Sequence, residues 1–201
     1  METIEVTRRD GIVTVLLNRP HKKNAMTPTM WEELIEVFAE VEASRDDRVL
    51  VITGAEDAFC SGADLTDAAG KDAAADGVGG SVERMRLVTR CALALHELRT
   101  PTLAAVNGVA AGAGLNLALG CDIVLASDRA RFSEIFSKRG LSVDFGGSWL
   151  LPRLVGLHRA KELVFLADII DATEAERIGL VNRVIAHDRF AEVVDDYARR
   201  L

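Results

Sequence analysis

The glycine-rich stretch GVAAGAG at residues 108–114 constrains the fold more than any other part of the chain. It ends an apolar run at 102–108, which predicts a strand, and it leads into AGLNLALG, which predicts a helix. Glycines at such a junction let the backbone approach a ligand closely, and they leave the first N–H groups of the helix unpaired. The order G-x-x-x-G-x-G is neither the dinucleotide fingerprint nor a phosphate loop. Close packing of the strand on the helix is therefore the alternative to a binding role.

The same order of strand, loop and helix recurs along the chain. A hairpin is predicted around Asp10-Gly11, because this dipeptide suits a turn with positive φ. Residues 66–80, rich in Ala, Asp and Gly, are predicted to form a mobile loop. Further helices are expected at 28–44, 82–99, 146–155, 159–166 and 173–178 and from Asp188 onward, and further strands at 48–54, 121–127 and 182–186. The pattern indicates an α/β protein whose strands feed short loops into a shared site.

Composition excludes several classes of function. The chain has 24 Lys and Arg against 31 Asp and Glu, a formal net charge of −7, so nucleic acid is not an expected partner. Cys60, Cys91 and Cys121 form no C-x-x-C pair, which argues against a disulfide framework or a metal site and favours a cytoplasmic location. Residues 100–121 carry no charge, but they hold too few large apolar side chains for a membrane span. A polyanionic ligand would need a local basic cluster, such as RPHKK at 19–23.

Two features suggest proton chemistry on a carbonyl compound. FCSGADL at 59–65 is a second loop at a strand end, and two N–H groups from such loops aimed at one point would form an oxyanion hole, worth roughly 3 kcal/mol per donor. Asp144 is a lone carboxylate among apolar residues, where burial would raise its pKa and suit it to moving a proton. Its alternative role is to cap the next helix. His96, His158 and His187 are better explained as structural, and His21 belongs to the basic cluster at 19–23, which is either a solvated loop or a phosphate contact. Ser61 has no partner that would make it a nucleophile.

Taken together, these segments resemble the crotonase superfamily, also called the enoyl-CoA hydratase/isomerase family. The resemblance runs from residue 4 to about residue 186. It is carried by LLNRPHKKNAMT, VLVITGAEDAFCSGADL, PTLAAVNGVAAGAGLNLALGCDIVLASDRARFS, GGSWLLPRLVG and AERIGLVNRV. It implies an α/β fold with a crotonase-like spiral of ββα units over 1–186. Residues 187–201 would then begin a C-terminal helical segment, and the usual helical extension is expected to be shortened or missing.

The resemblance also implies an acyl-CoA thioester as the substrate, with no permanently bound cofactor and no metal. By position, the thioester oxygen would be held by the backbone N–H groups of Ala63 and Ala113. A homotrimer or a dimer of trimers is implied if the C-terminal helices are present. The residues expected to bind coenzyme A or the acyl group are Lys22, Ala25, Asp64, Leu65, Gly112, Asn116, Phe136 and Arg139.

Departures from the family pattern narrow the expected reaction. Hydratases of the family hold water between two glutamates, whose positions are here taken by Asn116 and Phe136. Glu134 lies about 200° around a helix from Phe136 and is expected to face elsewhere. Asp144 matches the position of the single base in some isomerases of the family and of the nucleophile in its dehalogenases. The expected activity is therefore a double-bond shift in an enoyl-CoA, with Asp144 as acid/base and with Phe136 and Trp149 around a dry acyl pocket. The alternatives are a hydratase in which Asp144 activates water, a non-catalytic acyl-CoA-binding member of the fold and, least favoured, a dehalogenase.

Overall fold

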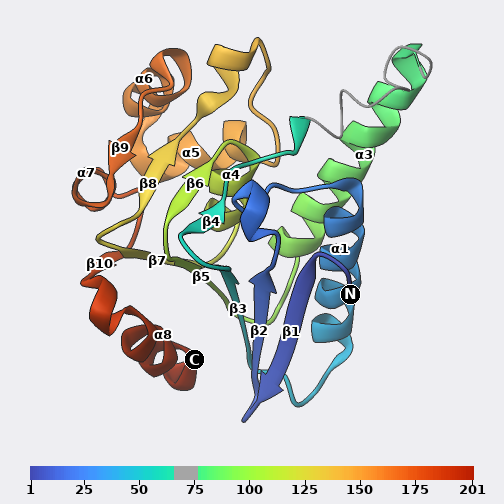
Figure 1. Cartoon of the computed structure of the whole chain (residues 1–201), viewed down its shortest axis with the longest axis vertical. Coiled ribbons are helices and arrows are strands. Elements are labelled where there is room, and N and C mark those ends of the chain that lie inside the picture. Colours follow the sequence, from blue (N-terminus) through green and yellow to red (C-terminus); the bar gives the residue numbers. More distant parts are fainter. Residues whose placement is uncertain (66–76) are drawn as a thin grey trace.

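The computed structural model describes residues 1–65 and 77–201 as two sheets with helices packed around them (Figure 1). The larger sheet has the strand order β1-β2-β3-β5-β7-β10, and all its pairs are parallel except β1 with β2. Its strands are β1 Ile4–Arg9, β2 Ile12–Leu17, β3 Val49–Gly54, β5 Thr102–Val106, β7 Ile123–Ser127 and β10 Arg183–Ile185. The smaller sheet contains β4 Ala58–Cys60, β6 Val109–Ala111, β8 Arg131–Ser133 and β9 Ile170–Asp171 in that order.

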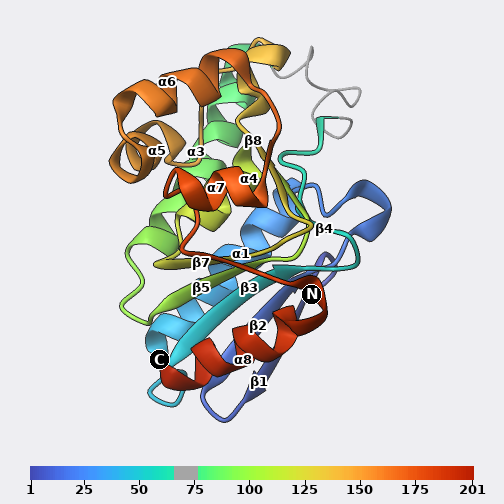
Figure 2. The same cartoon turned by 90° about the vertical axis from the view of Figure 1, so that its left-hand side faces the viewer.

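The helices cover both faces of the larger sheet. Alternate residues of its central strands contribute to two cores: Leu50 and Ile52 of β3 belong to the larger core, while Val49 and Val51 pack toward the C-terminal helix. Figure 2 shows α8 on this second face of the sheet and α1 behind it. The α-helices are α1 Pro28–Ala43, α3 Gly77–His96, α4 Ala113–Leu119, α5 Gly147–Val155, α6 Leu157–Leu166, α7 Ala172–Arg177 and α8 Phe190–Arg200. The 3-10 helices are η1 Pro20–Lys22, η2 Ile135–Arg139 and η3 His187–Arg189.

A repeated ββα unit positions the loops. Strands β3, β5 and β7 of the larger sheet each lead into a short strand of the smaller sheet, and β4, β6 and β8 pair side by side in parallel. The carboxyl ends of these three short strands therefore lie at one edge, where the chain turns into α3, α4 and η2. The expected α/β fold of ββα units is confirmed. Among the described residues, no helix is both long and apolar enough to cross a membrane.

Local expectations were met in most places. Asp10 and Gly11 both have positive φ, of 55° and 81°, as the predicted hairpin turn requires. The helix expected at 82–99 begins earlier, at Gly77. The sequence did not indicate this start, because the glycines in the first turn have a low helix propensity. The mobile loop predicted for 66–80 is therefore wrong for 77–80, and its residues 66–76 lie outside the described part of the chain.

The first prediction concerns the close contact between α4 and β4. A Cβ added at Gly114 would lie 2.3 Å from the backbone oxygen of Cys60, and both segments are buried. Gly114→Ala is expected to lower the free energy of unfolding by about 1–3 kcal/mol, because backbone must move. Urea unfolding measures this change. Gly120→Ala is the control, since its Cβ would lie 3.0 Å from the end of the Leu95 side chain and no nearer than 3.4 Å to backbone; equal losses in the two variants would contradict the prediction.

Candidate functional site

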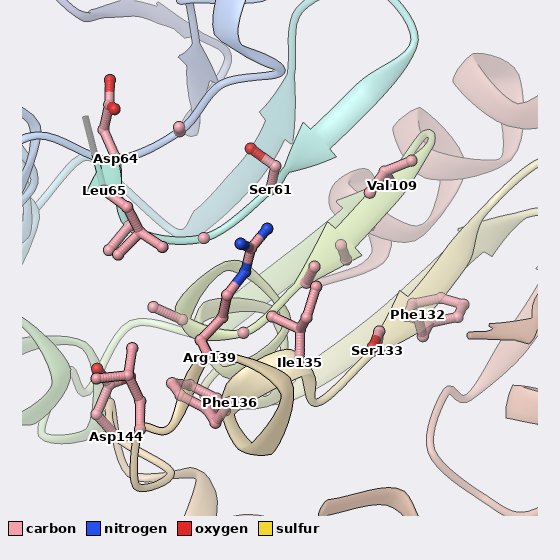
Figure 3. A pocket seen from close by; sticks show the side chains of 18 of the residues that line it. Ser61, Asp64, Leu65, Val109, Phe132, Ser133, Ile135, Phe136, Arg139 and Asp144 are labelled. Carbon is pink, nitrogen blue, oxygen red and sulfur yellow. The ribbon is translucent and has the colours of Figure 1, made fainter. Parts of the chain in front are cut away.

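One cavity of about 510 Å³ opens at the carboxyl ends of β4, β6 and β8 (Figure 3). Three loops form its wall: the segment after β4, the start of α4 with β6, and η2 with the loop that follows it. Most of the predicted site residues meet here, which brings together positions more than eighty residues apart in the sequence. Those that line the cavity are Ala25, Ala63, Asp64, Leu65, Gly112, Ala113, Phe136, Arg139 and Asp144.

Three expected site residues lie elsewhere. Lys22 is exposed at the end of η1, outside the cavity wall. Asn116 is fully buried on α4, behind the wall. Trp149, expected beside Phe136, is half exposed and packs against the His96 ring at 5.2 Å, so its predicted place in the acyl pocket is wrong. The reason is that Trp149 lies on the face of α5 that is turned toward solvent.

Two loops meet backbone to backbone at the cavity. Gly62 has a φ of +100°, and a Cβ built there would lie 2.9 Å from the backbone oxygen of Ala111 and 3.7 Å from the nitrogen of Ala113. Glycine is required at Gly62 both for the left-handed conformation and for the close approach. The segments that carry Ala63 and Ala113 are therefore held next to each other.

The N–H groups of Ala63 and Ala113 are free to bind a ligand. A β-bridge to Met26 helps to hold the first loop: the Met26 N–H donates to Gly62 O and the Asp64 N–H donates to Met26 O, both at 2.8 Å. Ala63 lies between these bonds, and Ala113 is the first residue of α4. Within 1–65 and 77–201, neither N–H donates to a protein acceptor. Two unpaired donors on adjacent loops form an arrangement that can bind an anionic oxygen.

The basic cluster at 19–23 contributes less positive charge than its sequence suggested. Arg19 binds the Asp64 carboxylate at 3.1 Å and also donates to the backbone oxygen of Ala25, and both charged side chains are largely buried. The Asp64 side chain points away from the cavity (Figure 3). Arg19 thus holds the loop of Ala63 in place, and Asp64 serves as its partner. Asp64 lines the cavity as expected of a residue near the ligand, and its carboxylate is bound by Arg19.

Asp144 has the surroundings of a proton-transfer group. Burial raises its pKa to about 6, and its Oδ1 has no hydrogen-bond partner among the described residues. The capping alternative is wrong, because the N-cap of α5 is Gly146 and no side chain caps this helix. Phe145, with a φ of 47°, stacks on Trp31 of α1 at 5.3 Å between ring centroids. This ring contact fixes the loop and directs Asp144 toward the cavity.

Glu134 was expected to face away from the site, and the structure corrects this. Its side chain is 1% exposed, it lies beside Asn116, and the charge of Asp144 acts on it. The pKa of Glu134 is raised to about 8, mainly by burial; the Asn116 side chain lowers it and the nearby Asp144 charge raises it. The angular argument failed because β8 ends at Ser133 and η2 is a 3-10 helix, so no continuous α-helix relates Glu134 to Phe136. An acidic residue in an otherwise apolar segment was the available signal.

Other nucleophiles and metal ligands offer no competing chemistry. Burial raises the pKa of the Cys60 thiol to about 12, and Cys91 and Cys121 are buried as well. Ser61 donates its hydroxyl to Lys22 O at 3.2 Å. The described residues contain no cluster of His, Cys, Asp and Glu that could hold a metal ion.

Sequence comparisons relate the chain to known proteins. A sequence model described as enoyl-CoA hydratase/isomerase matches residues 7–201. The chain is 41% identical to the 1,2-epoxyphenylacetyl-CoA isomerase of Escherichia coli (strain K12), over 100% of this chain and 76% of the relative. It is 33% identical to the short-chain-enoyl-CoA hydratase of Clostridium acetobutylicum, over the same shares of the two chains.

Solved structures agree with the sequence comparisons. The enoyl-CoA hydratase from Bacillus anthracis superposes with a TM-score of 0.93 at 30% identity, covering 99% of this chain and 76% of that chain. An enoyl-CoA hydratase from Mycobacterium avium subsp. paratuberculosis K-10 superposes with a TM-score of 0.88 at 33% identity, covering 100% of this chain and 75% of that chain.

The raised pKa of Glu134 predicts how stability depends on pH. The ordinary pKa of 4.5 applies to the unfolded chain, whereas the folded chain keeps the proton up to about pH 8. Between these values the folded state binds more protons, so the free energy of unfolding contributed by Glu134 falls as pH rises. Glu134→Gln removes this contribution. The variant is expected to lose less thermal stability than the wild type between about pH 5 and pH 8. The prediction would be contradicted if Glu134→Gln and the wild type lost the same Tm over this pH range. It would also be contradicted if the exposed control Glu162→Gln lost less Tm than the wild type.

Proposed function

The chain belongs to the enoyl-CoA hydratase/isomerase family, and we propose that it shifts a double bond within an enoyl-CoA thioester, with Asp144 as the single acid/base. One observation carries the proposal. Among the described residues that line the cavity, the acidic side chains are Asp64 and Asp144, and Arg19 neutralises Asp64. This leaves Asp144 as the group that moves the proton.

The proposed reaction needs one base and one anion site. Asp144, ionised at neutral pH because its pKa is about 6, removes an activated proton from the substrate carbon chain. The thioester oxygen gains negative charge as the dienolate forms, and the N–H groups of Ala63 and Ala113 bind it. The same proton then returns from Asp144 to another carbon. Protons balance over the cycle, and no water is consumed.

The surroundings of the cavity support this assignment. Phe136 lines the cavity and is 5% exposed, and Asn116 is uncharged and lies behind the wall, so neither position supplies an acid/base. We place coenzyme A along Lys22, Ala25 and Leu65, with Gly112 beside the thioester and the acyl group near Phe136. Arg139, whose side chain extends across the cavity toward Ser61 in Figure 3, would contact the substrate. The name of the Escherichia coli relative also favours an isomerase.

Two alternatives share the same cavity. In a hydratase, Asp144 would activate water, and the relative from Clostridium acetobutylicum carries a hydratase name. In a non-catalytic binder, the thioester would be held without turnover. The raised pKa of Asp144 and its place at the cavity favour an enzyme, because a binder gains nothing from an unpaired carboxylate in a half-buried position.

Removal of the proposed base is the direct test. Asp144→Asn keeps the size of the side chain and removes its proton chemistry, so kcat for conversion of 3-enoyl-CoA to 2-enoyl-CoA is expected to fall by about 10²–10⁴-fold. Binding of the substrate, measured by calorimetry, should persist. Short, medium, long and aryl substrates are assayed in parallel, together with addition of water to 2-enoyl-CoA. The exposed Asp46→Asn is the matched control. Full isomerase activity in Asp144→Asn would overturn the proposal, and tight binding with no turnover by the wild type would favour the binder.

The anion site is tested by removing one donor. Proline is tolerated at the first position of a helix, so Ala113→Pro removes an N–H while α4 can still form. The loss of this donor is expected to lower kcat/KM by roughly 10²–10³-fold. Ala113→Gly keeps the N–H and is the control, with circular dichroism as the check on folding. Wild-type kcat/KM in a folded Ala113→Pro protein would contradict the assignment.

A further inference from the structure

All the buried side-chain oxygens that lack a partner within the described residues lie on three neighbouring positions. They are Asn116 Oδ1, both carboxyl oxygens of Glu134 and Asp144 Oδ1. These groups come from α4, from the residue after β8 and from the loop before α5. Buried polar atoms in proteins are nearly always hydrogen-bonded, and an unpaired one costs free energy. Their concentration directly behind the cavity therefore points to a role in the chemistry.

The Asn116 amide links the two carboxyl groups. Its Nδ2 donates to the backbone oxygen of Asp144 at 3.0 Å, and its side chain also acts on the Glu134 carboxyl. A Cβ at Gly147 would lie 2.3–2.5 Å from the Asn116 amide atoms, so the start of α5 packs tightly against this amide and fixes its position. Apart from the two N–H groups of the Asn116 amide, the cluster contains only acceptors when both carboxyls are ionised. A proton on Glu134 would provide a further donor.

We infer that Glu134 is a positioning residue for Asp144: it holds a proton behind the cavity, so that the single negative charge of the cluster resides on Asp144, facing the substrate. The inference rests on the proposed function of Asp144. Glu134 does not line the cavity, and it therefore acts through Asn116 and Asp144 without touching substrate. Its own proton stays in place during the cycle.

The charged groups on the surrounding elements are engaged elsewhere or exposed. Helix α4 carries no titratable side chain, and Arg153 of α5 lies over the Trp149 ring, where His96 of α3 also packs. Lys138 of η2 donates to the backbone oxygen of Ala167 and pairs with Asp168. On α6, Arg159 pairs with Glu174, and His158, Lys161 and Glu162 are exposed. Arg139 of η2 is exposed at the cavity, so Asp144 is the charge that acts on the Glu134 carboxyl.

A protonated Glu134 has a kinetic consequence. Once Glu134 ionises, a second negative charge lies behind Asp144 and raises the affinity of Asp144 for its proton. Proton return to the dienolate then slows. Activity should consequently rise as Asp144 ionises, near pH 6, and fall again as Glu134 ionises, near pH 8. The alkaline fall belongs to Glu134, although this residue never meets the substrate.

The pH profile of kcat tests the inference. In the wild type, kcat is expected to fall above the second pKa and to level off at a lower value, because ionised Glu134 slows proton return without removing the acid/base Asp144. Glu134→Gln cannot ionise, so its profile should keep the rise near pH 6 and lose the alkaline fall, which a purely structural role would leave unchanged. Glu134→Leu also lacks the fall but has no polar group for Asn116, so its kcat should be lower at every pH, with KM unchanged. Glu162→Gln, on the exposed face of α6, is the matched control and should show both limbs.

Two results would overturn the inference: an unchanged alkaline fall in Glu134→Gln, or a wild-type profile that stays flat above pH 8. Failure of the proposed function gives a different result, namely no turnover of any enoyl-CoA by the wild type. In that case, carbon NMR of the full chain with labelled Asp carboxyls reports the coupling without activity. The Asp144 signal, assigned with Asp144→Asn, should show a second step near pH 8 in the wild type and none in Glu134→Gln. A second step in both proteins would overturn the inference.

Discussion

The parallel pairing of β4, β6 and β8 is the constraint on which the site depends. These strands are three residues long, so few hydrogen bonds join them. Their positions are set by β3, β5 and β7, which pair in parallel immediately before them in the chain. Pairing at one edge brings the loops after β4 and β6 within backbone contact at Gly62. A larger side chain there would push the loops apart, and the N–H groups of Ala63 and Ala113 could no longer face one oxygen. The proposed anion site is thus a product of backbone geometry, in which the two alanines would contribute N–H groups without side-chain chemistry.

The proton-transfer side of the cavity is built from different interactions. The loop that carries Asp144 has no regular structure, and it is held by the Phe145 ring on Trp31 and by the hydrogen bond from Asn116. One contact comes from the buried face of α1 and the other from α4, which is buried throughout, so the loop is fixed between two helices. The stacking also explains how Phe145 maintains a positive φ, which is unfavourable for a bulky residue. Local strain in this loop accompanies the placement of the carboxylate.

Sequence patterns predicted the parts of this protein that depend on local or periodic signals. The apolar run of β3, the Asp10-Gly11 turn and the glycines before α4 indicated an α/β fold with loops at a shared site, and the family resemblance supplied the ββα spiral and most residues of the cavity wall. Contacts between distant segments carried no such signal. The pairing of Arg19 with Asp64 joins residues 45 positions apart, and it converts an expected ligand-binding charge into a structural one. Trp149 and Glu134 were misplaced for a similar reason, since the outward face of α5 and the end of β8 depend on the packing of whole elements.

The reactions that such a site can catalyse depend on how many side chains in the cavity can take up and release a proton. Addition of water to a double bond requires a base for the water and an acid for the carbon, which two ionisable groups in the cavity usually provide. Among the described acidic residues that line this cavity, Asp144 is the one without a cationic partner, and Glu134 is enclosed behind the wall. A double-bond shift requires one group that takes a proton and returns it, because the charge between these steps is held by the thioester oxygen. In the proposed function, the half-buried carboxylate of Asp144 beside the N–H groups of Ala63 and Ala113 meets that requirement, and the role inferred for Glu134 is to keep the charge on the side where the substrate lies.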